Sequence, residues 1–187
     1  MYPSIRLLAI SGSLRVASVN TAMLRAASLV APERVKVSFY ERLGELPYFD
    51  PELDDDMLSP AIVADFRARI FGSHAVLLST PEYGHGIPGV LKNALDWVSR
   101  SGELVGKAVG IISPAGKALR AHAQLSETLT VMAARIVPEA CTTMPMNGRS
   151  HDAAAIAASA ECASILRRLL GDLAAVVDAD RSVGPER

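Results

Sequence analysis

The chain has 187 residues, of which half are hydrophobic and 21% are charged, and its formal net charge is −1. This composition excludes disorder over most of the chain, and the absence of a large basic run disfavours binding to nucleic acid. No apolar run approaches the ~20 residues of a membrane span, and no secretory signal opens the sequence, so we expect a cytoplasmic protein that binds no membrane. The length suits a single domain over residues 1–187, with a polar, frayed tail from about residue 178.

Strand-like and helix-like segments alternate along the chain. Short apolar runs predict five strands, at residues 5–10, 35–39, 75–79, 107–113 and 136–144. Helices are predicted at residues 20–30, 60–71, 118–135 and 153–177, with a further helix after residue 88. Such alternation is typical of a doubly wound α/β domain, in which helices cover both faces of a parallel sheet.

The first predicted strand is followed by a hydroxyl-rich loop, residues 11–20, that leads into the first helix. The first N–H groups of a helix have no intrahelical partners and the helix dipole is positive there, so this loop can hold an anion. Hydroxyl, amide and guanidinium groups suited to a phosphate come from Ser11, Ser13, Arg15, Ser18, Asn20 and Thr21. The loop lacks the glycines and the lysine of nucleotide-binding loops, which favours a monophosphate. The same residue types also form turns and helix caps, so a purely structural loop is the alternative.

Two more loops, residues 80–88 and 113–119, are expected at the same edge of the sheet. In open parallel sheets ligands bind outside the carboxyl ends of the strands, where the strand order reverses. Residues 80–89 contain two prolines and three glycines, and they could present amide groups and the ring of Tyr83 to a flat heteroaromatic molecule. The alternative is a simple connection that places Pro88 in the first turn of the next helix.

Two motifs extend this interpretation. Gly-Ser-Leu-Arg, followed by Ser18 and Asn20, comes after the first strand, while Pro-Glu-Tyr at 81–83 and Ile-Pro-Gly-Val-Leu-Lys-Asn-Ala-Leu-Asp-Trp at 87–97 come after the third. Together they resemble the NADPH-dependent FMN reductase family, a flavodoxin-like group that includes quinone, azo-dye and chromate reductases. The resemblance covers residue 5 to about residue 138. It implies a five-stranded parallel sheet of order 2-1-3-4-5 with FMN where the order reverses, and it implies homodimers, often paired into homotetramers.

The resemblance also implies the residues that contact FMN. Those near the phosphate would be Ser11, Ser13, Leu14, Arg15, Ser18, Val19, Asn20 and Thr21. Those near the isoalloxazine would be Pro81, Glu82, Tyr83, Gly84 and His85, with Ser113 approaching from the third loop. Residues 46–50 would lie near a neighbouring subunit and its flavin. This chain departs from the family pattern at Gly84, where Asn is usual, and at residues 117–120, where a Gly-Gly pair is common, so flavin contact and nicotinamide access there stay open.

The reaction implied is hydride transfer from NADPH or NADH to the flavin, and then reduction of a quinone, an azo compound, free flavin or a similar small acceptor. The flavin carries this chemistry, so no catalytic side chain is required. His85 could protonate a reduced acceptor, or it could only shape the acceptor site. The alternatives are a flavodoxin-like electron carrier and a flavin-free binding module that acts through a protein partner. Carriers tend to be strongly acidic, so a net charge of −1 gives that alternative little support.

Other chemically distinctive residues are assigned structural roles. Glu82 is expected to be a structural or subunit-contact carboxylate rather than a general base. Trp97 fits the buried face of its helix, and Cys141 and Cys162 are expected to be buried thiols. The acidic residues 54–56 are expected in a solvated loop, and no metal site is predicted because their spacing matches no known ligand cage.

Overall fold

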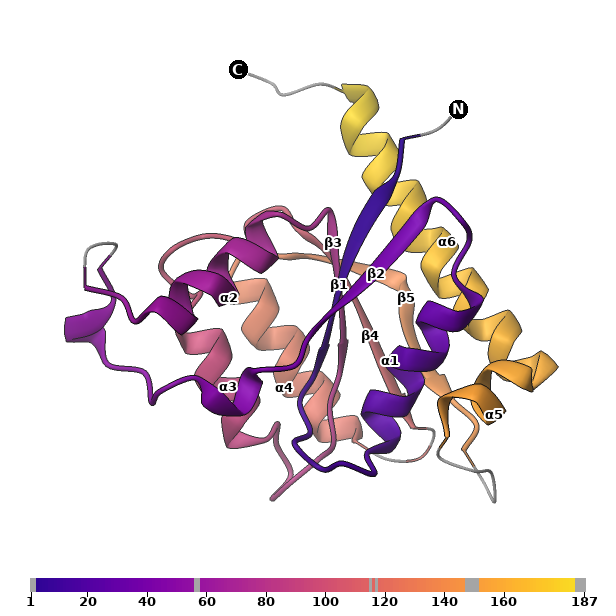
Figure 1. The fold of residues 1–187 in the computed structure, drawn as a ribbon, viewed down its shortest axis with the longest axis horizontal. Coiled ribbons are helices and arrows are strands. Elements are labelled where there is room, and N and C mark those ends of the chain that lie inside the picture. The colour runs from indigo at the N-terminus through magenta and orange to yellow at the C-terminus, as the bar shows by residue number, and fades with distance from the viewer. Residues whose placement is uncertain (1–2, 56–57, 115, 117, 147–151, 184–187) are drawn as a thin grey trace.

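The computed structural model describes residues 3–55, 58–114, 116, 118–146 and 152–183, and Figure 1 shows the fold. Five parallel strands form one sheet in the order β2-β1-β3-β4-β5, which confirms the predicted order. The strands are β1 (Ile5–Ser11), β2 (Val35–Tyr40), β3 (Ala75–Ser79), β4 (Ala108–Pro114) and β5 (Arg135–Met144). The predicted strands agree with these bounds to within one residue.

Helices cover both faces of the sheet, as predicted. Helices α1, α5 and α6 pack on one face, and α2, α3 and α4 pack on the other (Figure 1). The helices are α1 (Val19–Val30), α2 (Ala61–Phe71), α3 (Gly89–Asp96), α4 (Leu119–Val131), α5 (Ala153–Ala158) and α6 (Ala160–Val183). Among the helices that the structure describes, none is both long enough and apolar enough to cross a bilayer.

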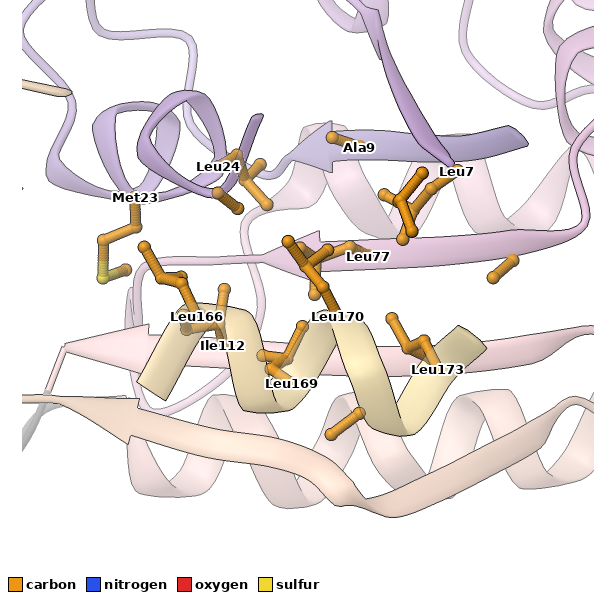
Figure 2. Close-up of a cluster of buried hydrophobic side chains, with 14 of the residues drawn as sticks. Leu7, Ala9, Met23, Leu24, Leu77, Ile112, Leu166, Leu169, Leu170 and Leu173 are labelled. Carbon is orange, nitrogen blue, oxygen red and sulfur yellow. The ribbon is translucent and has the colours of Figure 1, made fainter. Parts of the chain in front are cut away.

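The sheet is buried on both faces because successive side chains of a strand point to opposite sides. In β1, Leu7 and Ala9 belong to the cluster under α1 and α6, whereas Leu8 and Ile10 belong to the cluster under α2, α3 and α4. Figure 2 shows the first cluster, in which Leu170 and its neighbours on α6 face the sheet. Burial of both faces explains the continuous apolar sequences of β3 and β4, whereas the edge strands β2 and β5 also carry exposed polar residues.

The last predicted helix, over residues 153–177, is divided into α5 and α6. The division falls at Ser159, whose backbone is extended (φ −72°, ψ 117°). The Ser159 hydroxyl accepts a hydrogen bond from the N–H of Cys162 at 3.4 Å, in the manner of a residue that caps a helix start. A run rich in alanine gave no sign of this break, because the serine is compatible with a helix until its side chain bonds to the backbone.

The frayed tail predicted from residue 178 is wrong for residues 178–183, because α6 continues to Val183, and residues 184–187 lie outside the described residues. Two ion pairs hold this part of the helix to the sheet: Asp178 contacts Arg34 and Asp180 contacts Arg135, each at 2.5 Å. The polar residues of the tail are therefore one face of a docked helix.

Helix α4 ends earlier than the predicted residue 135. Its end is a left-handed turn at Ala133 (φ 55°), whose N–H donates to the carbonyl oxygen of Thr130 at 2.9 Å. The N–H of Ala134 donates to the carbonyl oxygen of Leu129 at 3.0 Å. These two bonds form a Schellman motif, which satisfies carbonyl groups at the helix end and usually carries glycine where Ala133 stands.

The long connection between β2 and α2 is held against α3. It contains two short 3-10 helices, η1 (Leu43–Glu45) and η2 (Pro51–Leu53). The Asn93 side chain accepts from the N–H of Phe49 and donates to the carbonyl oxygen of Pro47, both at 2.8 Å. The Trp97 indole N–H donates to the same oxygen at 2.9 Å, and Trp97 is fully buried as predicted. Asn93 and Trp97 of the second motif therefore fix residues 47–49.

The prediction of a solvated acidic loop is wrong for Asp54. Its carboxylate is buried and paired with Arg67, which is also buried and which donates to the carbonyl oxygen of Trp97 at 2.8 and 3.0 Å. Residue 56 lies outside the described residues. The pair joins the connection to α2 and to the end of α3, a contact that depends on residues far apart in the sequence.

The two thiols differ in their surroundings. Cys162 is fully buried as predicted, whereas Cys141 on β5 is only partly buried. Burial still raises the pKa of the Cys141 thiol, with Glu139 acting in the same direction.

Candidate functional site

The loop between β1 and α1 is shaped by its own hydroxyl groups. The Ser11 and Thr21 hydroxyls lie 2.8 Å apart and share a hydrogen bond. Ser18 is the N-cap of α1 and accepts from the N–H of Thr21 at 3.4 Å, while the N–H of Ser13 donates to the Ser11 hydroxyl at 3.3 Å. Four of the eight residues predicted near the phosphate thus also form the turn and the helix cap. The structural role and the phosphate-binding role predicted for this loop therefore involve the same residues.

A buried contact joins this loop to β3. The Asn20 side chain is 3% exposed, and its Oδ1 accepts from the hydroxyl of Ser79 at 3.0 Å. The N–H of Gly12 donates to the carbonyl oxygen of Ser79 at 2.8 Å, and a Cβ at Gly12 would come within 2.6 Å of Thr80 Oγ1. A side chain at residue 12 would therefore push the first and second loops apart. Asn20 was predicted as a phosphate ligand, but its oxygen is already used within the protein.

The outer part of the first loop presents an exposed positive charge. Leu14 and Arg15 are exposed, and no carboxylate among the described residues pairs with the Arg15 guanidinium. Arg15 stands beside the start of α1, where Val19 opens the helix and the dipole is positive. The cavity at this point has a volume of about 540 Å³, and its walls include Ser11, Ser13, Arg15, Ser18 and Thr21. A charged guanidinium without a partner, next to a helix start, fits a phosphate group.

The second loop is a tight turn closed by two backbone hydrogen bonds between Tyr83 and Gly86, at 2.9 and 3.0 Å. Its central residues, Gly84 and His85, are both left-handed, with φ values of 56° and 62°. Glycine and asparagine are the residues that accept this conformation most readily, so Gly84 keeps the backbone that the family's usual Asn would adopt. The His85 ring is held by Arg120, whose Nη1 lies 2.9 Å from Nδ1. Tyr83 remains 54% exposed at the tip.

Glu82 fastens the second loop to α4. One oxygen of its carboxylate accepts from the backbone N–H groups of Arg120 and Ala121, at 2.8 and 3.0 Å. These are the amides that an N-cap side chain normally satisfies, but the N-cap of α4 is Ala118, which has no side-chain acceptor. Glu82 therefore has the structural role expected of it, and its carboxylate is turned towards the helix.

Gln124 of α4 also holds the second loop against this helix, a contact that the sequence did not predict. Its Oε1 accepts from the N–H of Ile87 at 2.7 Å, and it occupies the space where a side chain at Gly86 would lie. Neither Gln124 nor Arg120 gives a sequence signal for this role, because both lie more than 30 residues from the loop that they hold.

The third loop leaves one polar atom without a partner. Ser113, at the carboxyl end of β4, is 1% exposed, and its hydroxyl is one of two buried side-chain oxygens without a hydrogen-bond partner among the described residues. Buried hydroxyls are normally satisfied, so this one fits a polar atom supplied by a bound group. The departure from the family at residues 117–120 is described only from Ala118 onward, and Ala118 is left-handed (φ 64°).

The three loops converge at the carboxyl edge of the sheet. One cavity of about 490 Å³ lies between them, with walls that include Val19, Asn20, Pro81, Glu82 and Pro114. Another of about 390 Å³ lies on the far side of the second loop, where Leu14, Arg15 and Tyr83 form part of its wall. The geometry thus combines a cavity beside the Arg15 guanidinium with two further recesses at the same edge of the sheet, which suits FMN. Three of the predicted residues lie outside the walls of these cavities: Ser113, and Gly84 and His85 at the exposed tip of the second loop.

This fold and this edge define a flavodoxin-like α/β protein with a hydroxyl-rich, arginine-bearing loop after its first strand. The sequence profile of NADPH-dependent FMN reductases matches residues 5–147, and the chain belongs to that family.

Named relatives support the assignment. The chain is 37% identical over 137 residues to an NAD(P)H-dependent FMN reductase of Pseudomonas aeruginosa, covering 71% of this chain and 73% of the relative. It is 36% identical over 118 residues to an NADPH:quinone oxidoreductase of Arabidopsis thaliana, with 61% and 60% covered, and 34% identical over 122 residues to a 2-hydroxy-1,4-benzoquinone reductase of a Burkholderia species, with 60% and 65% covered. The chain spans less than two thirds of the length of these last two relatives.

A solved structure agrees over nearly the whole chain. FerB, a flavoenzyme NAD(P)H:acceptor oxidoreductase from Paracoccus denitrificans, superposes with a TM-score of 0.67 at 28% identity, and the match covers 93% of this chain and 96% of FerB. The structural match extends beyond residue 147, where the family profile ends, so the shared fold includes the C-terminal helices.

Proposed function

We propose that this protein is an NAD(P)H-dependent FMN reductase that passes electrons from a nicotinamide to a quinone or a similar small acceptor. The observation that carries the proposal is the unpaired Arg15 guanidinium beside the start of α1, within a loop whose hydroxyls are already ordered. Membership of the family and the names of the relatives support it.

Each of the three loops has a task in holding FMN. Arg15 and Ser13 bind the phosphate, and the first amides of α1 complete its ligands. The turn at Tyr83–Gly86, together with Pro81, would line the isoalloxazine. The Ser113 hydroxyl donates to the flavin from the third loop, which satisfies its unused bonding capacity. When bound, the flavin supplies the two-electron chemistry, and no side chain of this chain is required as a catalyst.

His85 is placed to shape the acceptor site. Its ring lies at the exposed tip of the second loop, and the contact with Arg120 fixes its position. Quinones, azo compounds and free flavin are all flat molecules that an acceptor site beside this loop would admit.

The assembly is proposed to be a homodimer or a homotetramer of single-domain subunits in the cytoplasm. Tyr48 is 92% exposed although Pro47 and Phe49 on either side are held by Asn93. A rigid segment that displays a large aromatic side chain to solvent fits contact with a neighbouring subunit. Light scattering after gel filtration would measure the assembly state.

The experiment that tests this function measures FMN binding and its reduction. Calorimetry on the apoprotein should show FMN binding, and Arg15→Ala should weaken it by roughly 1–3 kcal/mol, the range for hydrogen bonds to charged groups. Arg15→Lys should lose less, and Arg168→Ala, an exposed arginine on α6, should bind FMN as the parent does. Under argon, NADPH or NADH should bleach the bound flavin, and a quinone should restore its colour.

Each alternative predicts a different result. Bound FMN that neither nicotinamide reduces would identify an electron carrier. A folded protein that binds no FMN would leave a flavin-free binding module, and the proposal would then be wrong.

A further inference from the structure

We propose that a second anion-binding site, for a phosphate group, lies at the opposite edge of the sheet, where Arg6, His74, Lys107 and Arg181 meet. These residues come from β1, from the segment before β3, from the segment before β4 and from the last turn of α6. They line one cavity of about 390 Å³. The site is independent of FMN, because the proposed flavin loops follow the other ends of the same strands.

The cavity carries uncompensated positive charge. Arg6, Lys107 and Arg181 have no carboxylate within ion-pair distance among the described residues. Asp180, the acidic residue in the wall, is already paired with Arg135 at 2.5 Å. Three cations around one recess repel one another, and an anion between them would remove that repulsion.

Part of this charge has a structural task. Arg6 Nε donates to the carbonyl oxygen of Gly72 at 2.7 Å, and Lys107 Nζ donates to those of Phe71 and Ser73 at 3.3 and 2.7 Å. These carbonyls lie at the end of α2, where positive groups are favourable. Arg6 still has hydrogen-bond donors available for a ligand, because its two terminal nitrogens have no partner in the described part of the chain.

The contact between His74 and Arg181 leaves donors available. The backbone N–H of Arg6 donates to His74 Nδ1 at 2.8 Å, so that nitrogen carries no proton and the neutral ring is protonated at Nε2. Arg181 Nη2 lies 3.0 Å from Nε2 and 3.3 Å from Nδ1, and it also donates to the carbonyl oxygen of Ser4 at 3.1 Å. The Nε2–H group and the Arg181 guanidinium are therefore neighbouring donors, and one oxygen placed beside both would accept from each.

The titration of His74 agrees with this geometry. Burial lowers the pKa of His74, and Arg6, Arg181 and Lys107 lower it further. Burial and Arg6 also lower the pKa of Lys107, against the opposing effect of Glu103. The charged groups that act on the ring are thus Arg6 on β1, Lys107 before β4 and Arg181 on α6. Asp180 lies in the same cavity wall and is paired with Arg135 of β5, and Glu103 acts on Lys107. A bound anion would reverse the net effect and raise the pKa of His74.

The test follows the His74 ring by NMR in the full chain, with the signal assigned from its loss in His74→Gln. Inorganic phosphate, titrated at constant ionic strength against chloride, should shift this signal in a saturable way and move its titration to higher pH. Because the signal reports only this edge, phosphate binding at the first loop does not interfere. A nucleoside monophosphate is the second probe: binding tenfold tighter than phosphate would identify a nucleotide, and equal binding a free phosphate.

Arg181→Ala should weaken the phosphate response about tenfold, the effect of losing one hydrogen bond to a charged group. Arg168→Ala removes the same charge from the same helix about 20 Å away and should leave the response unchanged. Arg6→Ala is a second variant for the case in which loss of Arg181 unfolds the end of α6, which circular dichroism would reveal. A His74 signal that ignores phosphate, or one that responds equally in the arginine variants and the parent, would overturn the proposal.

Discussion

Glu82 offers a direct test of how the second loop is held. In Glu82→Ala, the N–H groups of Arg120 and Ala121 lose the oxygen that accepts from them at 2.8 and 3.0 Å. Loss of an N-cap acceptor costs about 1 kcal/mol, and loss of a negative charge at a helix start costs up to about 1 kcal/mol more. We therefore expect the free energy of unfolding to fall by about 2 kcal/mol.

Urea unfolding followed by the fluorescence of Trp97, the one tryptophan of the sequence, measures this change. Glu82→Gln keeps an acceptor oxygen without the charge, so it should lose about half as much. Glu127→Ala removes an exposed carboxylate from the same helix and should change stability by less than about 0.5 kcal/mol. If Glu82→Ala proved as stable as Glu127→Ala, the carboxylate would not be the cap of α4, and the reasoning would fail.

Three further predictions concern stability. Ala133→Gly should raise the free energy of unfolding by about 1 kcal/mol, because glycine accepts φ 55° without strain. Ala123→Gly, an exposed change in the middle of the same helix, should lower the free energy of unfolding by about 1 kcal/mol, and equal effects of the two changes in urea melts would contradict this reasoning. Asp54→Ala should cost about 3 kcal/mol in the same assay, since it leaves the buried Arg67 without its counter-charge, and a loss below about 1 kcal/mol would argue against a buried pair. Burial lowers the pKa of His122 from 6.5, so the unfolded chain binds its proton first and stability falls as the pH drops below that value; His122→Gln should flatten this decline in melts taken across the pH range.

Much of the fold was predictable because its signals are local. Apolar residues marked the strands to within one residue, and most clearly β3 and β4 in the middle of the sheet, since burial on both faces demands continuous apolar runs there. The loop at 11–20 was recognisable because a serine cap and a helix start are encoded by neighbouring residues. The predicted helix bounds were wrong where the local sequence is compatible both with a helix and with its end. Ser159 breaks the last helix and Ala133 ends α4 early, although both residue types are acceptable inside helices.

The sequence by itself therefore determined the class of fold, the order of its elements and the position of the hydroxyl-rich loop after the first strand, because backbone preference and amphipathic pattern act over a few residues. Only the tertiary structure decided that Glu82 caps a helix 38 residues away, that the Ser113 hydroxyl is buried without a partner, and that Arg6 and Arg181 meet at one cavity. Such contacts depend on how whole elements pack, and no neighbouring residue specifies them.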